Sequence, residues 1–297
     1  MVGAPEGSSG QLRILVTGAG GQVGTDVVRL AEAAGHHEVL GASHGALDVA
    51  DRDAVMAAIT AWRPDLVVHT AAWTAVDACE SDRERAWRVN AFGCRNVAEA
   101  ARAAGSHLVA VSTDYVFDGS SPEPYVEWDR PNPLSVYGAS KRAGELEVAG
   151  LLAGATVVRT SWVCGPHGSN MVKTVLRLGA AGGPLRFVDD QRGCPTFTED
   201  LARMLLELGV ARRPGVFHVT NQGATTWYRF ARDVLAAAGM DPSRVEPIAT
   251  SDLDPPRPAP RPANSVLDNA ALRMSGIPLL AEHHDPLERT VKGLVSG

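Results

Sequence analysis

In the first half of the chain, short apolar runs alternate with segments in which apolar residues recur at helical spacing. Short runs with the length of buried β-strands cover residues 12–17, 38–42, 66–69, 107–111 and 155–159. Between them, apolar residues recur about every 3.6 positions, as in Val23, Val27 and Leu30, which indicates amphipathic helices. Further helices are expected at 51–62, at 83–104 with a stop at Gly105, and around Tyr137 behind an N-cap at Ser135. Strands alternating with helices predict an α/β fold with a doubly wound, parallel Rossmann-type sheet.

The alternation becomes irregular after Trp162. Helices are expected at 169–178, 198–208 (with Thr198 as N-cap), 226–238 and from Asp285 onwards, with a strand at 216–219 and an extended, proline-dense segment at 252–262. We therefore expect a smaller C-terminal α/β substrate-binding region. The larger domain would comprise 12–165 and roughly 196–240, the substrate-binding region roughly 166–195 and 241–297, and residues 1–11 would be a disordered tail.

Composition narrows the range of partners. The 297 residues include 45% apolar and 21% charged side chains, and the formal net charge is −6. This balance gives no broad basic surface, so nucleic acid is not an expected partner. The four cysteines form no CxxC pair, and neither a membrane-length apolar run nor a signal peptide is seen, which favours a cytoplasmic protein. The adjacent pairs His36-His37 and His283-His284 are interpreted as solvated loop histidines.

A glycine turn joins the first strand to the first helix. Gly18, Gly21 and Gly24 fit G-x-x-G-x-x-G between a β-type run and a helical pattern. Glycines allow the backbone to approach a diphosphate, and the helix N-terminus offers it free N–H groups. The turn thus predicts a dinucleotide site, the alternative being a tight turn without a ligand.

The end of the second strand bears on which dinucleotide is bound. An acid there would hydrogen-bond the adenosine ribose of NAD, whereas this chain has Ser43, followed by His44. A small uncharged residue removes repulsion against a 2′-phosphate, which favours NADPH. The alternative is that Ser43 is an ordinary loop residue and that NADH is also used.

Tyr137 and Lys141 stand four residues apart, on one face of the predicted helix. An ammonium near a phenol favours phenolate, so Lys141 is expected to lower the pKa of Tyr137 and make it a better proton donor. Ser112 and Thr113 bring hydroxyls to the end of the fourth strand, where open α/β sheets bind ligands. Taken alone, the Tyr–Lys spacing is more often a solvated pair than a catalytic one.

The order of these motifs resembles the extended short-chain dehydrogenase/reductase superfamily. Finer segments resemble the dTDP-4-dehydrorhamnose reductase family from Leu12 to the C-terminus. These segments are GQVG at 21–24, AAWTAVD at 71–77, STDYVFDG at 112–119, TSWV at 160–163, DQRGCPT at 190–196 and RPANSVLD at 261–268.

This resemblance implies reduction of the C4 ketone of a dTDP-linked deoxysugar by NAD(P)H, the last step of dTDP-rhamnose synthesis. It implies cofactor contacts at the diphosphate from Gly21, Gln22 and Val23, around the adenine from Asp48 and Val49, and along the cleft from Ala71, Ala72 and Trp73. It implies Tyr137 as proton donor, Lys141 on the nicotinamide ribose, Thr113 on the ketone with Asp114 beside it, and Trp162 at the substrate.

The resemblance also raises a metal ion and a homodimer as possibilities. Some family members bind Mg²⁺ through acidic side chains at a subunit interface, and Asp26 and Glu199 occupy matching positions without completing a ligand set. Two rival functions remain. The first is a nucleotide-sugar dehydratase or epimerase of the same fold; a dehydratase is disfavoured because Asp114 is followed by Tyr115 rather than Glu, whereas an epimerase stays open. A non-catalytic, NADP-binding regulatory subunit would keep the same motifs.

Overall fold

The computed structural model describes residues 10–296, so most of the tail expected at 1–11 lies outside the described residues. The strands are β1 (Arg13–Thr17), β2 (Glu38–Ala42), β3 (Leu66–His69), β4 (His107–Thr113), β5 (Thr156–Thr160), β6 (Val163–Cys164), β7 (Leu185–Val188), β8 (Arg192–Gly193), β9 (Thr196–Phe197), β10 (Gly215–His218), β11 (Thr225–Thr226) and β12 (Val245–Ile248). The α-helices are α1 (Gln22–Ala33), α2 (Arg52–Trp62), α3 (Val76–Ser81), α4 (Arg83–Trp87), α5 (Gly93–Ala104), α6 (Val136–Leu151), α7 (Met171–Ala181), α8 (Thr198–Val210), α9 (Trp227–Ala237), α10 (Ala270–Met274) and α11 (His284–Ser296).

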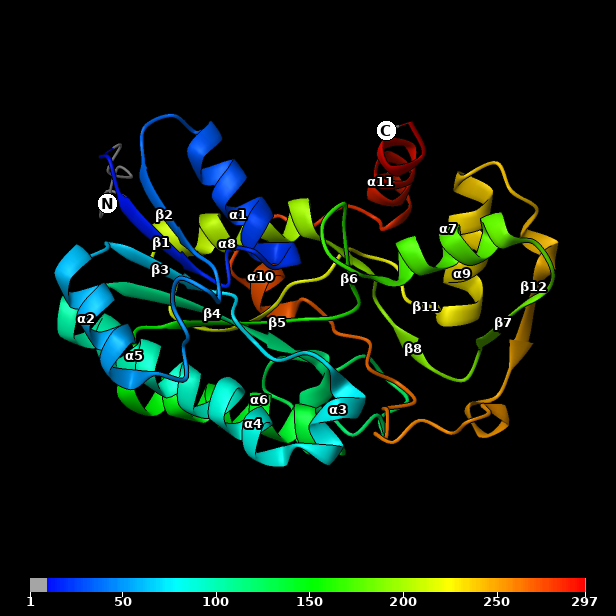
Figure 1. The fold of residues 1–297 in the computed structure, drawn as a ribbon, viewed down its shortest axis with the longest axis horizontal. Coiled ribbons are helices and arrows are strands. Elements are labelled where there is room, and N and C mark those ends of the chain that lie inside the picture. Colours follow the sequence, from blue (N-terminus) through cyan, green and yellow to red (C-terminus); the bar gives the residue numbers. More distant parts are fainter. Residues whose placement is uncertain (1–9, 297) are drawn as a thin grey trace.

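A six-stranded parallel sheet with the order β10-β5-β4-β3-β1-β2 forms the centre of the molecule. Helices α1 and α8 cover one face, and α2, α5 and α6 cover the other (Figure 1). Successive strand residues point to opposite faces, so Ile14 and Val16 join the core beneath α1 and α8, while Leu15 joins the core beneath α2 and α5. The predicted doubly wound α/β fold is confirmed.

The smaller region has a core of its own. Helices α7, α9 and α11 pack with the parallel pair β7 and β12 around buried residues such as Phe230 and Leu235 (Figure 1). Helix α9 therefore packs with the smaller region, although the sequence division places 226–238 with the larger domain. We propose that the boundary follows this packing, with α8 and β10 in the Rossmann domain and α9 in the substrate-binding region.

The helix expected over 83–104 is interrupted. Residues Arg88–Phe92 form a π-helical turn between α4 and α5. Within it, the side chain of the buried Asn90 accepts a hydrogen bond from Trp73 N (2.8 Å) and donates to Trp73 O (3.1 Å) and Ser140 Oγ (3.0 Å). These bonds tie the loop after β3 to α6, an arrangement that helical periodicity alone does not reveal.

Two expected helix caps are wrong by one or two residues. The N-cap of α8 is Phe197, and Thr198 is already helical with a buried hydroxyl that has no partner. Helix α11 begins at His284, so Asp285 lies in its first turn. Within residues 10–296, no helix combines the length and apolar character needed to cross a bilayer.

Candidate active site

Two adjoining clefts run along the edge of the sheet where β1 to β4 end. The larger, of about 620 Å³, and the smaller, of about 490 Å³, share Gly21, Thr70 and Ala72 in their walls. All the site residues predicted from the sequence line one cleft or the other. The larger is lined by Gly21, Gln22, Val23, Gly24, Thr113, Asp114, Tyr137, Lys141 and Trp162, and the smaller by Gly18, Gly21, Ser43, Asp48, Val49, Ala71, Ala72 and Trp73.

Backbone atoms pack so closely around Gly18 and Gly24 in the glycine turn that neither position has room for a side chain. Gly18 has φ of +71°, and a Cβ there would lie 2.6 Å from the backbone nitrogen of Ala71. A Cβ on Gly24 would strike the carbonyl oxygen of Gly18. Helix α1 starts at Gln22 with Gly21 as N-cap and no side-chain cap, so its first N–H groups and positive dipole end face the larger cleft. This end of α1 suits an anionic diphosphate.

Helix α6 brings Tyr137 and Lys141 to the end of β4. Ser135 is its N-cap, accepting a hydrogen bond from Gly138 N (3.1 Å), as the sequence predicted. Lys141 Nζ donates to Val111 O (2.7 Å), which fixes the ammonium beside the strand that ends at Thr113. All three predicted catalytic side chains, Tyr137, Lys141 and Thr113, are buried against the larger cleft.

The expected acidification of Tyr137 is wrong for the chain by itself. Burial raises the pKa of Tyr137 well above its ordinary value, and the negative charges of neighbours such as Asp114 act in the same direction, while the Thr113 hydroxyl opposes them. The ammonium of Lys141 is held by the Val111 carbonyl instead. Sequence spacing places a cation near the phenol but says nothing about desolvation, which dominates here.

Asp114 is a buried acid beside the hydroxyl of Thr113. Its side chain is only 2% exposed, and burial raises the pKa of Asp114 to about 7. Thr113 Oγ1 donates to Asp114 Oδ1 (3.1 Å), whereas Asp114 Oδ2 is buried without a hydrogen-bond partner. The cleft therefore contains a carboxyl group that can change its charge near neutral pH.

The far wall of the larger cleft is aromatic. Trp162 stacks on Trp227 of α9, with ring centroids 3.5 Å apart and an interplanar angle of 7°. Gln22 connects this wall to the glycine turn, since its side chain donates to Ser169 O (3.1 Å) and accepts from Asn170 Nδ2 (2.9 Å). Sequence reasoning missed Trp227 because no motif marks it; only the packing of α9 brings it to the cleft.

A second residue missed from the sequence is Arg85. It lines the smaller cleft, and its guanidinium lies 4.6 Å from the centroid of the Trp73 ring. Together with His44 in the same cleft, it places cationic or protonatable groups around Ser43 and Asp48. The sequence shows only a charged helical segment at this point.

A different arginine, Arg261, is bound by the Asp77 carboxylate at 2.9–3.0 Å.

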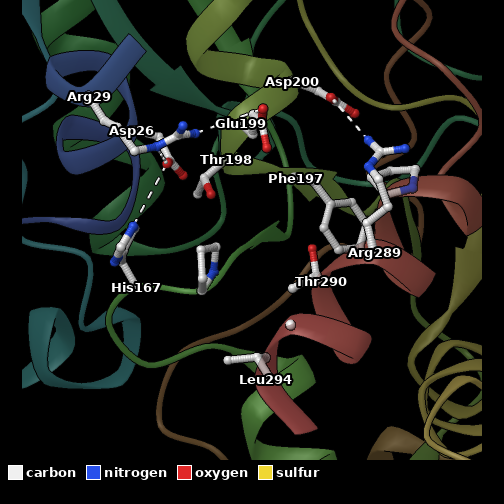
Figure 2. Close-up of a pocket in the computed structure, with 13 residues that line it drawn as sticks. Asp26, Arg29, His167, Phe197, Thr198, Glu199, Asp200, Arg289, Thr290 and Leu294 are labelled. Atoms are coloured by element: carbon white, nitrogen blue, oxygen red, sulfur yellow. Dashed lines mark hydrogen bonds and ion pairs between the residues drawn. The ribbon is translucent and has the colours of Figure 1, made fainter. Parts of the chain in front are cut away.

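A third cavity, of about 370 Å³, is lined by residues of α1, α8 and α11, among them Asp26 and Glu199 (Figure 2). Arg29 lies between the two acids, with Nε 3.1 Å from Asp26 Oδ1 and Nη2 3.8 Å from Glu199 Oε1. Arg289 lies 3.6 Å from the neighbouring Asp200. Arg29 thus pairs with both acids, while Asp200 and His167 line the same cavity.

The chain is similar to known proteins over almost its whole length. The RmlD substrate binding domain family matches residues 12–295. A dTDP-4-dehydrorhamnose reductase of Streptomyces griseus is 43% identical over 271 residues, covering 89% of this chain and 88% of the relative. A dTDP-4-keto-6-deoxy-D-glucose reductase of Streptomyces niveus is 40% identical over 266 residues, covering 89% and 91%.

Among solved structures, the dTDP-4-dehydrorhamnose reductase of Bacillus anthracis in complex with NADP superposes with a TM-score of 0.91. It is 36% identical and covers 97% of this chain and all of its own. A family match over nearly the whole chain and relatives at about 40% identity lead to one conclusion: the chain belongs to the RmlD substrate binding domain family.

Proposed function

We propose that the chain is an NAD(P)H-dependent reductase of the C4 ketone of dTDP-4-dehydro-6-deoxy-L-mannose, giving dTDP-L-rhamnose. The observation that carries the proposal is the gathering of Tyr137, Thr113 and the glycine turn on one cleft at the end of the parallel sheet. The names of the relatives, both reductases of dTDP-linked 4-keto sugars, support the substrate class.

The two clefts together have the shape and chemistry for a dinucleotide. Gly21, Gln22 and Val23 would hold the diphosphate with the free N–H groups of α1. Asp48 and Val49 would flank the adenine, and Ala71, Ala72 and Trp73 would form the wall between the clefts. The complex of the related Bacillus anthracis enzyme with NADP supports a nicotinamide dinucleotide as the cofactor.

We further propose that NADPH is preferred over NADH. Ser43 is exposed at the end of β2 and carries no charge that would repel a 2′-phosphate, and Arg85 lines the same cleft. The Ser43→Asp variant should shift the ratio of kcat/KM values for NADPH and NADH towards NADH by at least about tenfold, since like charges repel. An unchanged ratio would remove Ser43 from the recognition site.

A bound reduced nicotinamide would supply the hydride, while residues of this chain would stabilise the negative charge and donate the proton. As negative charge develops on the ketone oxygen, the hydroxyls of Thr113 and Tyr137 would stabilise it by hydrogen bonding. Tyr137 would then give up its proton. Its raised pKa keeps it protonated at neutral pH, so it is ready as a donor in the resting enzyme. Lys141, fixed on Val111 O, would bind the nicotinamide ribose.

The sugar nucleotide would lie against the aromatic wall of Trp162, which is stacked on Trp227, with Asp114 next to Thr113 at the ketone. The guanidinium of Arg261 forms an ion pair with Asp77 in the structure. The homodimer and the cytoplasmic location suggested by the sequence stay predictions.

The residues around Asp26 and Glu199 do not fit the Mg²⁺ that the family resemblance raised. Magnesium prefers near-octahedral oxygen ligands, whereas here Arg29 occupies the space between the two carboxylates (Figure 2). Among residues 10–296, no group of three His, Cys, Asp or Glu side chains converges at this cavity. We assign Mg²⁺ no part in the reaction.

The test follows NADPH oxidation by absorbance with dTDP-4-dehydrorhamnose as substrate. One NADPH should be consumed per ketone reduced, and Tyr137→Phe should lower kcat by about 10²–10⁴-fold while NADPH binding, measured by fluorescence, stays the same. Full turnover by Tyr137→Phe would refute the assignment of the proton donor. Sugar conversion without net NADPH consumption would instead indicate an epimerase or dehydratase.

A second substrate deserves a parallel assay. The Streptomyces niveus relative is named for reduction of dTDP-4-keto-6-deoxy-D-glucose and is nearly as similar to this chain. Comparing kcat/KM for the two sugars decides between them. Absence of turnover with either sugar, together with intact NADPH binding, would favour the regulatory-subunit alternative.

A further inference from the structure

The start of helix α11 and the middle of helix α9 bring Asp233, His283 and His284 together. One potential ligand atom from each side chain lies within 4.8 Å of the others. His284 Nε2 is 3.7 Å from Asp233 Oδ2, and the two histidine rings are stacked with centroids 4.1 Å apart. The sequence interpretation of these histidines as solvated is wrong for His283, which is only 3% exposed because it packs beside Phe230.

The hydrogen bonding of His283 leaves one ring nitrogen available. Its Nδ1 lies 3.1 Å from the carbonyl oxygen of Gln222, which can only accept, so Nδ1 carries the proton and donates. Nε2 then keeps its lone pair, and it is buried with no hydrogen-bond partner. A buried acceptor without a partner is costly, and a ring whose other nitrogen donates to a backbone carbonyl is the usual arrangement of a metal-bound histidine.

We propose that Asp233, His283 and His284 form a binding site for a divalent transition metal ion, for which Zn²⁺ is the best match. Two imidazoles and a carboxylate are ligands that Zn²⁺ accepts, with bonds of about 2.0–2.2 Å and a water in the remaining position. A tetrahedron of that size has edges of about 3.4 Å. To bind the same ion, the exposed His284 ring would have to turn out of its stack on His283 until its lone pair points at the metal. Mg²⁺ and Ca²⁺ match poorly because they require oxygen ligands.

A metal there would join α11 to α9. Among the described residues, α9 packs on the aromatic wall of the larger cleft through Trp227, and Trp227 also contacts Phe230, beside which His283 lies. The ion would therefore act as a structural clamp on the smaller region, away from the ketone and the glycine turn. This site is independent of the proposed reductase activity.

The experiment titrates Zn²⁺ alone into the full-length, tag-free chain by calorimetry, with Co²⁺ as a spectroscopic probe. We expect one saturable site, visible d–d absorption with Co²⁺, and a rise in melting temperature of about 3–8 °C at a hundredfold excess of Zn²⁺ over the dissociation constant. His284→Gln, at an exposed position, should fold like the parent and lose at least about tenfold in affinity, as should Asp233→Asn.

The matched control is His36→Gln. His36 and His37 are also adjacent, with ring centroids 3.9 Å apart, but they belong to no such group with an acid. This variant should bind Zn²⁺ like the parent. The proposal is overturned if the parent shows no saturable binding at one ion per chain, or if His284→Gln and Asp233→Asn keep the parent's affinity and the Co²⁺ spectrum. Equal losses in His36→Gln and His284→Gln would also overturn it, as adventitious surface binding.

Discussion

The ion pair between Arg159 and Glu145 ties the helix that carries Tyr137 to the central sheet. The two side chains are 2% and 3% exposed, and two hydrogen bonds of 2.9 Å join them. Glu145 also accepts from Ser112 Oγ (2.6 Å) and from Arg142 (2.7 Å). We predict that Arg159→Met strongly destabilises the fold, because it leaves a buried carboxylate without its main partner.

The expected loss in the free energy of unfolding depends on which partners Glu145 keeps in Arg159→Met. Removing one member of a buried pair costs about 3–5 kcal/mol, and the surviving bond from Arg142 places this case near about 3 kcal/mol. For a chain of this size that corresponds to a fall in melting temperature of about 6–10 °C. Arg142→Met is the matched control: Arg142 is 30% exposed, so its loss should cost only about 0–1 kcal/mol.

The assay is equilibrium urea unfolding, followed by circular dichroism and by tryptophan fluorescence. The double variant Glu145→Met with Arg159→Met should recover at least half of the lost free energy of unfolding, because it removes the stranded charge. A loss below about 1 kcal/mol in Arg159→Met, or no recovery in the double variant, would refute the reasoning.

The destabilisation caused by Arg159→Met should also depend on pH. Burial alone would raise the pKa of Glu145, but the hydrogen bonds and charge of Arg159 hold it below the ordinary value. In the parent the stabilisation from this group is therefore present above the unfolded-state pKa and is lost as the pH falls through the folded-state value. Without Arg159 the carboxyl takes up a proton more readily, so the difference between parent and variant should narrow from pH 7 to pH 4.

Three further predictions concern the turn, the core and the cleft. Gly24→Ala should lose about 1–3 kcal/mol of stability and weaken NADPH binding, because its Cβ would strike a backbone carbonyl. Gly150→Ala, with open space around it, should change neither property. Urea unfolding measures the stability, and fluorescence titration measures NADPH binding. Burial, and then the charge of Lys141, lowers the pKa of His69 to about 3, so between about pH 3 and 6.5 the unfolded chain binds a proton that the folded chain does not. The free energy of unfolding should therefore rise with pH over this range, by up to about 1.4 kcal/mol per pH unit. The His69→Gln variant should lack this contribution to the slope. Ionisation of Asp114, with a pKa raised by burial to about 7, should lower kcat/KM as the pH rises through 7, and the profile of Asp114→Asn should lose that step.

The central sheet and the positions of the site residues could be predicted because both depend on local pattern. Parallel strands end at one edge, so a glycine turn after β1 and hydroxyls after β4 must lie near each other. Burial and long-range packing could not be predicted in this way. Trp227 and His283 come from segments without a motif, and each takes its place only when α9 and α11 pack around Phe230.

The same distinction explains the error about Tyr137. Tyr137 and Lys141 both line the larger cleft, yet the ammonium bonds to the Val111 carbonyl, and burial raises the pKa of the phenol. A phenol with a raised pKa is a weak acid at rest and gives up its proton only to a stronger base, such as an oxygen that has just gained negative charge. Thr113 donates to Asp114 in the same structure, so it can turn to that oxygen most readily while Asp114 is neutral. We therefore propose that the cleft stabilises negative charge that appears during the reaction, rather than holding a permanently acidified donor.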